Sequence, residues 1–373
     1  MRLSCPTEIV FGEDALEALS PPGGRVLLLV SRSLPEALAD RLDGILKRAG
    51  KAVLLARRGG AEPDSAAVDA LVAGLGEPVD AVVAAGGGST LDCAKAVALC
   101  LAGGGGIADY EFGARPVKAA LPLFLVPTTC GSGSEVTPYA VVNNAATGRK
   151  FTLAAPCLRP RQALVDPGLL AGLPPLALRA GALDAFLHCL EAALGNPRNR
   201  LIEPLAAAGL GLVRRHLPGA LSGAPKKSWA EPLARAALYG GLCIAASRTG
   251  LVHTLSVALA RFSDLPHGLL NAWLAPRVLA YNADHYQGRL AALAEAAFDA
   301  RDVSDREAAR DIGGWLARML PPEAARLALA RPCDPAAVIA RVLEDTGLPA
   351  VNSRPLSPQA VTNLVLEITH GAP

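Results

Sequence analysis

A carboxylate and three imidazoles in the second half of the chain have types and spacings suited to a divalent cation. Asp184 and His188 are four positions apart, so a helix would place both side chains on one face. His253 and His267 follow later, the second in a Pro-His-Gly turn. Fe, Zn and Mn accept similar sets of imidazole nitrogen and carboxylate oxygen ligands, so these residue types do not select one metal. The alternative is that each histidine is an ordinary core or surface residue, and spacing alone leaves both interpretations open.

Two loops rich in glycine and hydroxyl side chains could bind a nucleotide. The first, residues 86–89 (Gly-Gly-Gly-Ser), follows an apolar run and precedes a helical pattern, so its backbone N–H groups and the helix dipole could face a pyrophosphate. It lacks the Gly-x-Gly-x-x-Gly fingerprint, so an ordinary Rossmann domain is not implied. The second, residues 127–137, carries five hydroxyl side chains and two glycines. Each could be a plain turn, but together they predict a nucleotide cleft at the carboxyl edge of a parallel sheet.

Alternating apolar and amphipathic segments predict the elements that carry these loops. Apolar runs at 26–30, 52–56 and 81–85 alternate with amphipathic stretches at 35–49 and 65–75, and further strands are expected at 121–126 and 164–165. From about Leu176 the pattern is helical, with breaks expected at 196–197, 217–218, 266 and 321–322. We therefore expect an α/β domain with a parallel sheet over residues 1–170 and an all-α domain over residues 171–373.

Composition narrows the class of protein. The 373 residues carry 36 Lys and Arg against 34 Asp and Glu, so no large basic field exists to hold a nucleic acid. The apolar runs are far shorter than the ~20 residues of a membrane helix, and no export signal is evident, so a cytoplasmic protein is expected. The eight cysteines contain no Cys-x-x-Cys pair, which argues for reduced thiols and against a structural zinc or iron–sulfur site.

Taken in order, these clusters resemble the iron-containing alcohol dehydrogenase family over nearly the whole chain. In that family an α/β domain with a parallel sheet binds the dinucleotide NAD or NADP, and an all-α domain holds Fe(II) or sometimes Zn(II), a fold shared with dehydroquinate synthases. The matching segments are residues 86–89 with Asp92 and Lys95, 127–129, 133–137, Lys150, 166–167, Gly181 with Asp184 and His188, 250–253 and 265–268.

The resemblance implies a role for each matching residue. The metal ligands would be Asp184, His188, His253 and His267. The cofactor-binding residues would be Gly87, Gly88 and Ser89 at the pyrophosphate, Asp92, Thr128, Thr129 and Ser132 at the rest of the dinucleotide, and Lys150 at the nicotinamide ribose. The metal would polarise an aldehyde oxygen while hydride arrives from NADPH or NADH, giving a primary alcohol. A small aldehyde or alcohol is thus the expected partner, and the frequent dimers among relatives suggest a homodimer.

Four residues, at three places in the chain, depart from the family pattern. Val257 stands where many members carry a second histidine assigned to proton relay, so solvent or a ribose hydroxyl must carry the proton. Ser31 and Arg32 stand where many members place an aspartate against the adenosine ribose, and a guanidinium there could accept the 2′-phosphate of NADP. Alternatively, Arg32 is a solvated loop residue. Glu62 replaces a frequent asparagine, and the sequence offers no account of it.

Several features look similar to phosphonoacetaldehyde reductases, which make 2-hydroxyethylphosphonate in phosphonate biosynthesis. They are Arg248, the Leu-Ser pair after His253, the run 150–153 and the tail 352–357. On a continuous helix, Arg248 would lie about 7.5 Å before His253, a reach suited to a phosphonate. Arg248 could equally form a structural salt bridge. Arg261 and Arg277 are further candidate anion partners, although Arg277 stands where many relatives have another histidine.

Four other functions compete with this interpretation. A general aldehyde reductase of the same family needs no anion site. Maleylacetate reductase, a sister group, usually lacks the complete metal set that persists here. A dehydroquinate synthase-like lyase normally uses a Glu and two His as metal ligands. A non-enzymatic binding protein is disfavoured because both cofactor loops and all four candidate ligands are retained.

Overall fold

The computed structural model describes residues 1–59 and 62–370, which form two units. The α/β unit is Cys5–Gly172, and the helical unit is Leu173–Pro373 together with Met1–Ser4. This division falls two residues after the boundary expected from the sequence. The first four residues belong to the helical unit because their backbone is held there: the Asn199 Nδ2 donates a hydrogen bond to the Arg2 carbonyl at 2.9 Å.

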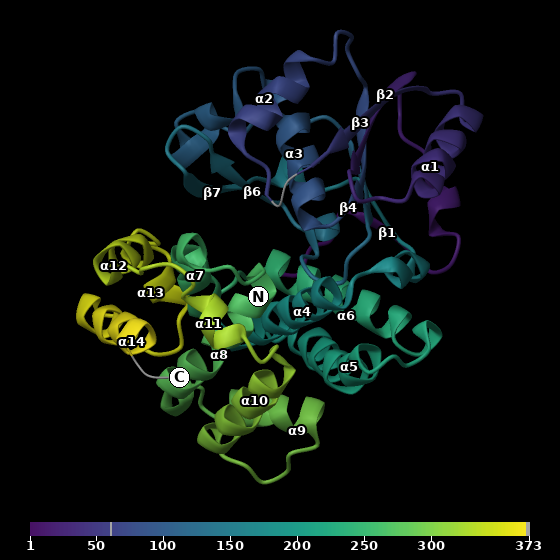
Figure 1. The fold of residues 1–373 in the computed structure, drawn as a ribbon. Helices are drawn as coiled ribbons and strands as arrows, with labels where there is room; N and C mark the ends of the chain where they lie inside the picture. The colour runs from purple at the N-terminus through teal and green to yellow at the C-terminus, as the bar shows by residue number, and fades with distance from the viewer. Residues whose placement is uncertain (60–61, 371–373) are drawn as a thin grey trace. The chain divides into compact units, whose positions relative to one another are not determined.

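The α/β unit is built on a six-stranded parallel sheet, as the alternating pattern predicted (Figure 1). Its strand order is β1-β8-β5-β4-β2-β3. The strands are β1 (Glu8–Phe11), β2 (Arg25–Ser31), β3 (Ala52–Arg58), β4 (Ala81–Gly86), β5 (Leu123–Pro127) and β8 (Gln162–Val165). The helices are α1 (Glu36–Arg48), α2 (Ser65–Ala73) and α3 (Gly88–Gly103). Because the strands are parallel, the residues that follow β2, β3, β4 and β5 all lie at one edge of the sheet.

Residues along each strand alternate between two buried faces. Leu27 and Leu29 of β2 pack with α2 and α3, whereas Val26, Leu28 and Val30 of the same strand pack with α1 and the 3₁₀ turn η1 (Ala15–Ala18). Figure 1 shows α1 on one face of the sheet and α2 and α3 on the other. Helices on both faces explain why these strands are continuous apolar runs rather than alternating patterns.

The sequence prediction did not include β1 or an antiparallel hairpin. The hairpin pairs β6 (Tyr139–Asn144) with β7 (Arg149–Ala154) and packs its apolar side against the α3 face of the sheet. Its strands alternate buried and less buried residues, which is the period-2 signal of a half-exposed sheet. That signal is short and lies next to the hydroxyl-rich loop, which masked it.

The helical unit contains no strand among its described residues, as predicted. Its helix α4 (Pro175–Leu194) is apolar on nearly all sides and packs against α5, α6 and α8. The other helices are α5 (Glu203–Leu221), α6 (Ala230–Ala246), α7 (Leu251–Leu259), α8 (His267–Asn282), α9 (Arg289–Phe298), α10 (Asp305–Met319), α11 (Ala324–Ala328), α12 (Pro335–Leu343), α13 (Leu348–Val351) and α14 (Pro358–His370).

One predicted helix break is wrong. Pro218 lies inside α5 rather than between helices. Proline removes one backbone hydrogen bond from a helix, but α5 ends at Leu221, so the loss falls in the final turn, where it disrupts little. The breaks expected at 196–197, 266 and 321–322 coincide with helix boundaries.

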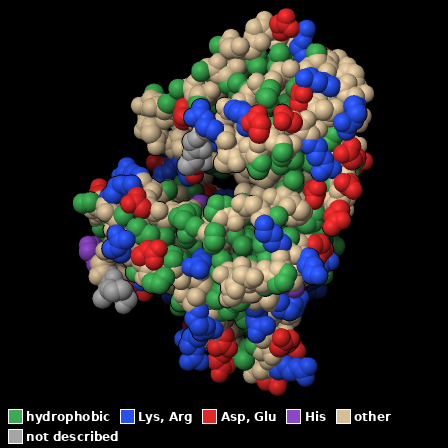
Figure 2. Space-filling view, turned by 45° about the vertical axis from the view of Figure 1, so that its right-hand side comes forward, with side chains coloured by type: hydrophobic (Ala, Val, Ile, Leu, Met, Phe, Trp, Pro, Cys, Tyr) green, Lys and Arg blue, Asp and Glu red, His purple; other side chains and the backbone are tan. Residues whose placement is uncertain are grey.

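The structure agrees with two expectations from the composition: reduced cysteines and no large basic field on the face that Figure 2 shows. All eight cysteines are free thiols, and five of them are buried. On the face shown in Figure 2, Lys and Arg side chains are interspersed with Asp and Glu, without a continuous basic surface among the residues drawn in colour. The near-balanced net charge is therefore also balanced locally on that face.

Candidate metal and cofactor sites

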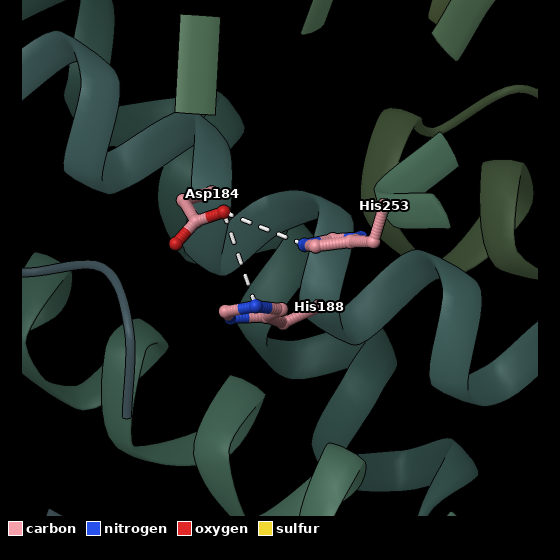
Figure 3. A group of neighbouring side chains, drawn as sticks. All are labelled: Asp184, His188 and His253. Carbon is pink, nitrogen blue, oxygen red and sulfur yellow. Dashed lines mark ion pairs between the residues drawn. The ribbon is translucent and has the colours of Figure 1, made fainter. Parts of the chain in front are cut away.

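Three of the four predicted metal ligands converge inside the helical unit. Asp184 and His188 lie one turn apart on α4, and His253 comes from α7 (Figure 3). The Asp184 Oδ1 lies 3.9 Å from the His188 Nε2 and 3.5 Å from the His253 Nε2. One ligand atom from each residue lies within 4.8 Å of the others, and all three residues are buried.

The fourth predicted ligand, His267, stands beside this group at the start of α8. Its Nε2 lies 3.8 Å from the Asp184 Oδ1, but it does not belong to the mutually close set of three, and its side chain is 38% exposed. The Asn271 Nδ2 donates to the Asp184 Oδ1 at 3.0 Å and lies 3.1 Å from the His267 Nε2. Coordination through the His267 Nε2 would therefore require the Asn271 amide to move away from that nitrogen.

A glycine allows α4 and α8 to approach closely enough to form this group. A Cβ atom at Gly268 would lie 2.0 Å from the Ala180 carbonyl oxygen and 2.9 Å from the Asp184 Cβ. Any side chain at Gly268 would push the two helices apart. The glycine of the Pro-His-Gly turn thus serves the contact between His267 and Asp184 rather than a special backbone angle.

The electrostatics of the group favour an ionised Asp184. Burial alone would raise its pKa, but the neighbouring His188 and the close approaches of His253 and His267 together hold the pKa of Asp184 well below its usual value. Burial likewise opposes a charged His253, but the close approach of the Asp184 carboxylate and the hydrogen bond with Glu191 outweigh it and raise the pKa of His253 to about 9.

These residues fit a divalent metal. The His253 Nε2 is buried and makes no hydrogen bond with any described residue, while its Nδ1 is hydrogen-bonded to the Glu191 Oε2 at 2.6 Å. Metal–ligand bonds of about 2.0–2.2 Å in tetrahedral geometry place donor atoms roughly 3.4 Å apart. The observed separations of 3.5 to 3.9 Å from Asp184 to the three imidazoles need only small adjustments to reach that spacing.

The glycine-rich loop of the α/β unit lies where the sequence predicted it. β4 ends at Gly86, and α3 begins at Gly88. A Cβ atom at Gly88 would lie 2.5 Å from the Ser132 Oγ. The second loop therefore packs directly on the first. Gly88 is needed for that contact, whether or not a ligand also approaches it.

The structure brings most predicted cofactor residues to the same sheet edge. Gly87, Gly88 and Ser89 follow β4, and Thr128 and Thr129 follow β5. The Thr128 N–H donates to the Gly86 carbonyl at 2.9 Å, so the two strand ends are directly connected. This is the edge at which nucleotides bind in open parallel sheets.

Asp92 and Lys95, which both match the family pattern, hold the second loop in place through hydrogen bonds. Asp92 accepts hydrogen bonds from the Ser134 hydroxyl at 2.7 Å and the Val141 N–H at 3.0 Å. Lys95 is fully buried, and its Nζ donates to the carbonyl oxygens of Ser134, Thr137 and Tyr139. Both oxygens of Asp92 already have partners within the protein. The sequence predicted that Asp92 contacts the dinucleotide. In the structure Asp92 also holds the second loop and β6 in place, a role that sequence reasoning did not anticipate.

Ser31 and Arg32 lie at the carboxyl end of β2, on the same sheet edge. The Ser31 hydroxyl is hydrogen-bonded to the Ser33 hydroxyl at 2.8 Å. The exposed Arg32 side chain lies against Gly59. Sequence reasoning missed Arg58 at the end of the neighbouring β3, which is 9% exposed and donates from Nη1 to the Ser89 Oγ at 3.2 Å. Arg58 could have been found from the sequence because it closely follows an apolar run, at the strand end where cofactor-binding residues are expected.

Lys150 lies on β7 and forms an ion pair with Glu62. Glu62 also accepts a hydrogen bond from the Asn143 Nδ2 at 3.0 Å. The carboxylate that departs from the family pattern therefore anchors the lysine and the hairpin. The sequence offered no account of Glu62, and the structure supplies this one.

The helical placement of Arg248 is wrong. Arg248 lies in the segment between α6 and α7, so no continuous helix joins it to His253. Its Nη2 donates to the Asp345 Oδ2 at 2.7 Å, which is the salt bridge that the sequence left open as the alternative. The other candidate anion partners, Arg261 and Arg277, stack on the rings of Phe262 and Trp273.

Val257 lies on α7, one turn after His253, and offers no proton-carrying group there. Sequence reasoning also missed Glu191 and Asn271, which contact the metal-site residues. Each stands about one helical turn after a predicted ligand, and that spacing was the available signal.

Two family models match the chain across both units. The model described as iron-containing alcohol dehydrogenase matches residues 6–167, and the model of the C-terminal part of the same family matches residues 179–364. The chain belongs to the iron-containing alcohol dehydrogenase family. It is an oxidoreductase, so the lyase and the non-enzymatic interpretations are set aside.

Individual relatives agree with this membership. Alcohol dehydrogenase 4 of Saccharomyces cerevisiae (strain YJM789) is 35% identical over 275 residues, covering 72% of each chain. The 1,3-propanediol dehydrogenase of Klebsiella pneumoniae is 29% identical, covering 78% of this chain and 77% of its own. An iron-containing alcohol dehydrogenase structure from Thermococcus thioreducens superposes with a TM-score of 0.85 at 26% identity, covering 100% of both chains. The predicted family and fold are confirmed, whereas closeness to phosphonoacetaldehyde reductases stays a prediction.

Within the described residues, no single helix of this alcohol dehydrogenase family member has the length and apolarity to span a membrane. One pair of consecutive segments, Ala230–Ala246 and Leu251–Phe262, meets the criterion jointly but is bent by 100°.

Proposed function

We propose that this protein interconverts a small aldehyde and its primary alcohol, with NADPH or NADH as the hydride donor for reduction. The observation that carries the proposal is the convergence of Asp184, His188 and His253, with His267 beside them. A bound divalent ion, Fe(II) or alternatively Zn(II), would supply Lewis-acid polarisation of the aldehyde oxygen.

The protein's own residues have separate tasks in this scheme. Asp184 stays ionised and supplies the one negative charge of the ligand set. The imidazoles would hold the ion as neutral ligands, so metal binding would release the proton that His253 otherwise retains. A single carboxylate leaves a divalent charge partly uncompensated, as Lewis-acid catalysis requires. Proton delivery from solvent or a ribose hydroxyl, in place of a residue at Val257, stays a prediction.

For the cofactor, we propose that the N-terminus of α3 binds the pyrophosphate through Gly87, Gly88 and Ser89. Free N–H groups at a helix start and the helix dipole support this assignment. We further propose NADP in preference to NAD, since Arg32 and Arg58 bring two guanidinium groups to the ends of β2 and β3. Guanidinium is a strong phosphate partner. The contacts of Thr128, Thr129, Ser132 and Lys150 with the dinucleotide stay predictions.

The identity of the aldehyde belongs to the same proposal. Phosphonoacetaldehyde is the substrate named by sequence resemblance, but Asp345 already neutralises Arg248. Small aldehydes without an anionic group are therefore equally suited to the site. Maleylacetate remains the sister-group alternative, which a complete metal set disfavours. A homodimer and a cytoplasmic location also stay predictions.

The test is the initial rate of NADPH and NADH oxidation by Fe(II)-loaded protein, with propanal and phosphonoacetaldehyde compared directly. Similar kcat/KM values for the two aldehydes support a general reductase. A phosphonate preference of about 100-fold, roughly 2.7 kcal/mol in the transition state, supports the phosphonate pathway enzyme. Failure to oxidise either cofactor with either aldehyde would contradict the proposal.

A further inference from the structure

Glu191 is a buried carboxylate on the helix that carries Asp184 and His188, but it does not lie among the candidate ligands. It stands one turn beyond His188 on α4, and its side chain is 9% exposed. A buried carboxylate is costly unless hydrogen bonds compensate its charge. Its contacts therefore indicate what it does.

Both oxygens of Glu191 are directed at α7. The Oε2 accepts a hydrogen bond from the His253 Nδ1 at 2.6 Å and from the Gly250 N–H at 3.0 Å, and the Oε1 accepts from the Val252 N–H at 2.7 Å. These backbone N–H groups stand at the start of α7, where a helix has no internal acceptors for them. One carboxylate thus holds the first turn of α7 and the His253 ring together.

The contact determines which nitrogen of His253 is available to a metal. In the neutral imidazole that binds a metal, a proton held on Nδ1 by Glu191 leaves the lone pair on Nε2. That Nε2 makes no hydrogen bond with any described residue and lies 3.5 Å from the Asp184 Oδ1. The His267 Nδ1, by comparison, lies 3.2 Å from the neutral hydroxyl of Ser256.

We propose that Glu191 is a positioning residue for the metal site: it fixes the tautomer and the ring orientation of His253 so that Nε2 faces Asp184. The inference rests on the proposed metal site and adds a residue that does not itself bind the ion. An anionic partner on the outer nitrogen also raises the basicity of a ligating imidazole. Three donors, two backbone N–H groups and the His253 Nδ1, face the Glu191 oxygens, which is the arrangement that suits a carboxylate that only accepts hydrogen bonds.

The test measures Co(II) affinity, by competition with a chelator, for wild-type protein and for Glu191→Gln. Co(II) serves as a visible probe for the same ligand set. We expect the dissociation constant to rise about 10–100-fold in Glu191→Gln, with a changed visible spectrum, because the anionic partner is lost and the volume is kept. A constant within about threefold of wild type, with an unchanged spectrum, would overturn the proposal.

A matched control separates positioning from local stability. Thr254 lies in the same first turn of α7, and its hydroxyl donates to the Gly250 carbonyl at 3.2 Å and to the Asp345 Oδ2 at 3.3 Å rather than to the His253 ring. Thr254→Val should weaken that turn and leave Co(II) affinity and the spectrum unchanged. An equal loss of affinity in both variants would reduce Glu191 to a helix-capping residue and refute the inference.

A second measurement on wild-type protein keeps the proposal testable if Glu191→Gln does not fold. Nitrogen NMR of histidine-labelled, Zn(II)-loaded protein reports which nitrogen of each of the six imidazoles bears a proton. The account requires His253 to be protonated at Nδ1 and bound through Nε2, and the reverse arrangement would overturn it.

If wild-type protein binds neither Co(II) nor Zn(II), the proposed metal site itself fails. Normal binding with an indifferent Glu191→Gln removes only the positioning role.

Discussion

The two candidate sites differ in how their polar side chains are used within the protein. In the helical unit, the His253 Nε2 lacks a hydrogen-bond partner among the described residues and points toward Asp184. In the α/β unit, Asp92 and Lys95 direct their polar atoms to the backbone and a hydroxyl group of the adjoining loop. The same resemblance singled out both sets. A polar atom without a hydrogen-bond partner in the protein is free to bind a ligand, whereas a residue whose polar atoms are all hydrogen-bonded within the protein supports the loop beside the ligand.

The largest expected effect comes from removing a ligand. His253→Ala should lower metal affinity and reduce kcat/KM by about 10³-fold or more, since the Lewis acid is lost with the ion. Metal content per chain and aldehyde reduction, measured on the same preparation, check this. His370→Ala, an exposed histidine at the end of α14, is the control and should change neither. Retention of metal and activity in His253→Ala would contradict the ligand assignment.

The next prediction tests the loop-building role of Lys95. Lys95→Met should destabilise the α/β unit by about 2–4 kcal/mol, because buried carbonyl groups lose their donor. It should weaken NADPH binding through the altered loop and leave Co(II) affinity unchanged. Urea unfolding and hydrogen exchange over residues 132–141 measure the first effect. Unchanged protection of that segment would show that Lys95 does not hold it.

Glu135 provides a pH test of the same loop. Burial raises the pKa of Glu135 to about 7, although a backbone hydrogen bond and Lys95 oppose the shift. Between its unfolded value of about 4.3 and pH 7 the folded state binds more protons, so stability falls as pH rises through this range. Glu135→Gln removes the free-energy cost of ionising a buried carboxyl group, because glutamine carries no charge at any of these pH values.

The stability of Glu135→Gln relative to wild type should therefore increase from pH 5 to pH 8, by an amount on the order of 2–3 kcal/mol. Urea titrations followed by far-UV circular dichroism at the two pH values measure it. The three tryptophans, Trp229, Trp273 and Trp315, all lie in the helical unit, so their fluorescence would not report on this loop. A pH-independent difference would show that Glu135 is ionised in the folded protein.

Arg32 tests the cofactor preference. Arg32→Ala should raise KM for NADPH by about 5–20-fold and leave KM for NADH nearly unchanged, because only NADPH carries the 2′-phosphate. Steady-state kinetics with both cofactors and propanal decide it. Equal changes for the two cofactors would return Arg32 to the role of a solvated loop residue.

The smallest effect is expected at Arg248. Its salt bridge with Asp345 is partly exposed, so Arg248→Ala should cost at most about 1 kcal/mol of stability. It should alter KM for propanal and phosphonoacetaldehyde equally. A KM rise confined to phosphonoacetaldehyde would instead restore Arg248 as a substrate-binding residue and favour the phosphonate function.

Local spacing made some of the structure predictable from sequence. The strand and helix alternation before residue 88 and the Asp184–His188 pair are local patterns, and the structure contains both. Arg248 was misplaced because the break before α7, at Gly250, is a turn with no proline to mark it. The roles of Asp345, Glu62 and Glu191 depend on partners distant in sequence. Such contacts have no local pattern.

The most direct test of the central claim is an anaerobic Fe(II) titration of chelator-treated protein, with propanal reduction and bound iron measured at each point. The account predicts that activity rises from near zero and saturates at one iron per chain. Full activity in the metal-free protein, or saturation without bound iron, would contradict the assignment of Asp184, His188, His253 and His267 as the site on which aldehyde reduction depends.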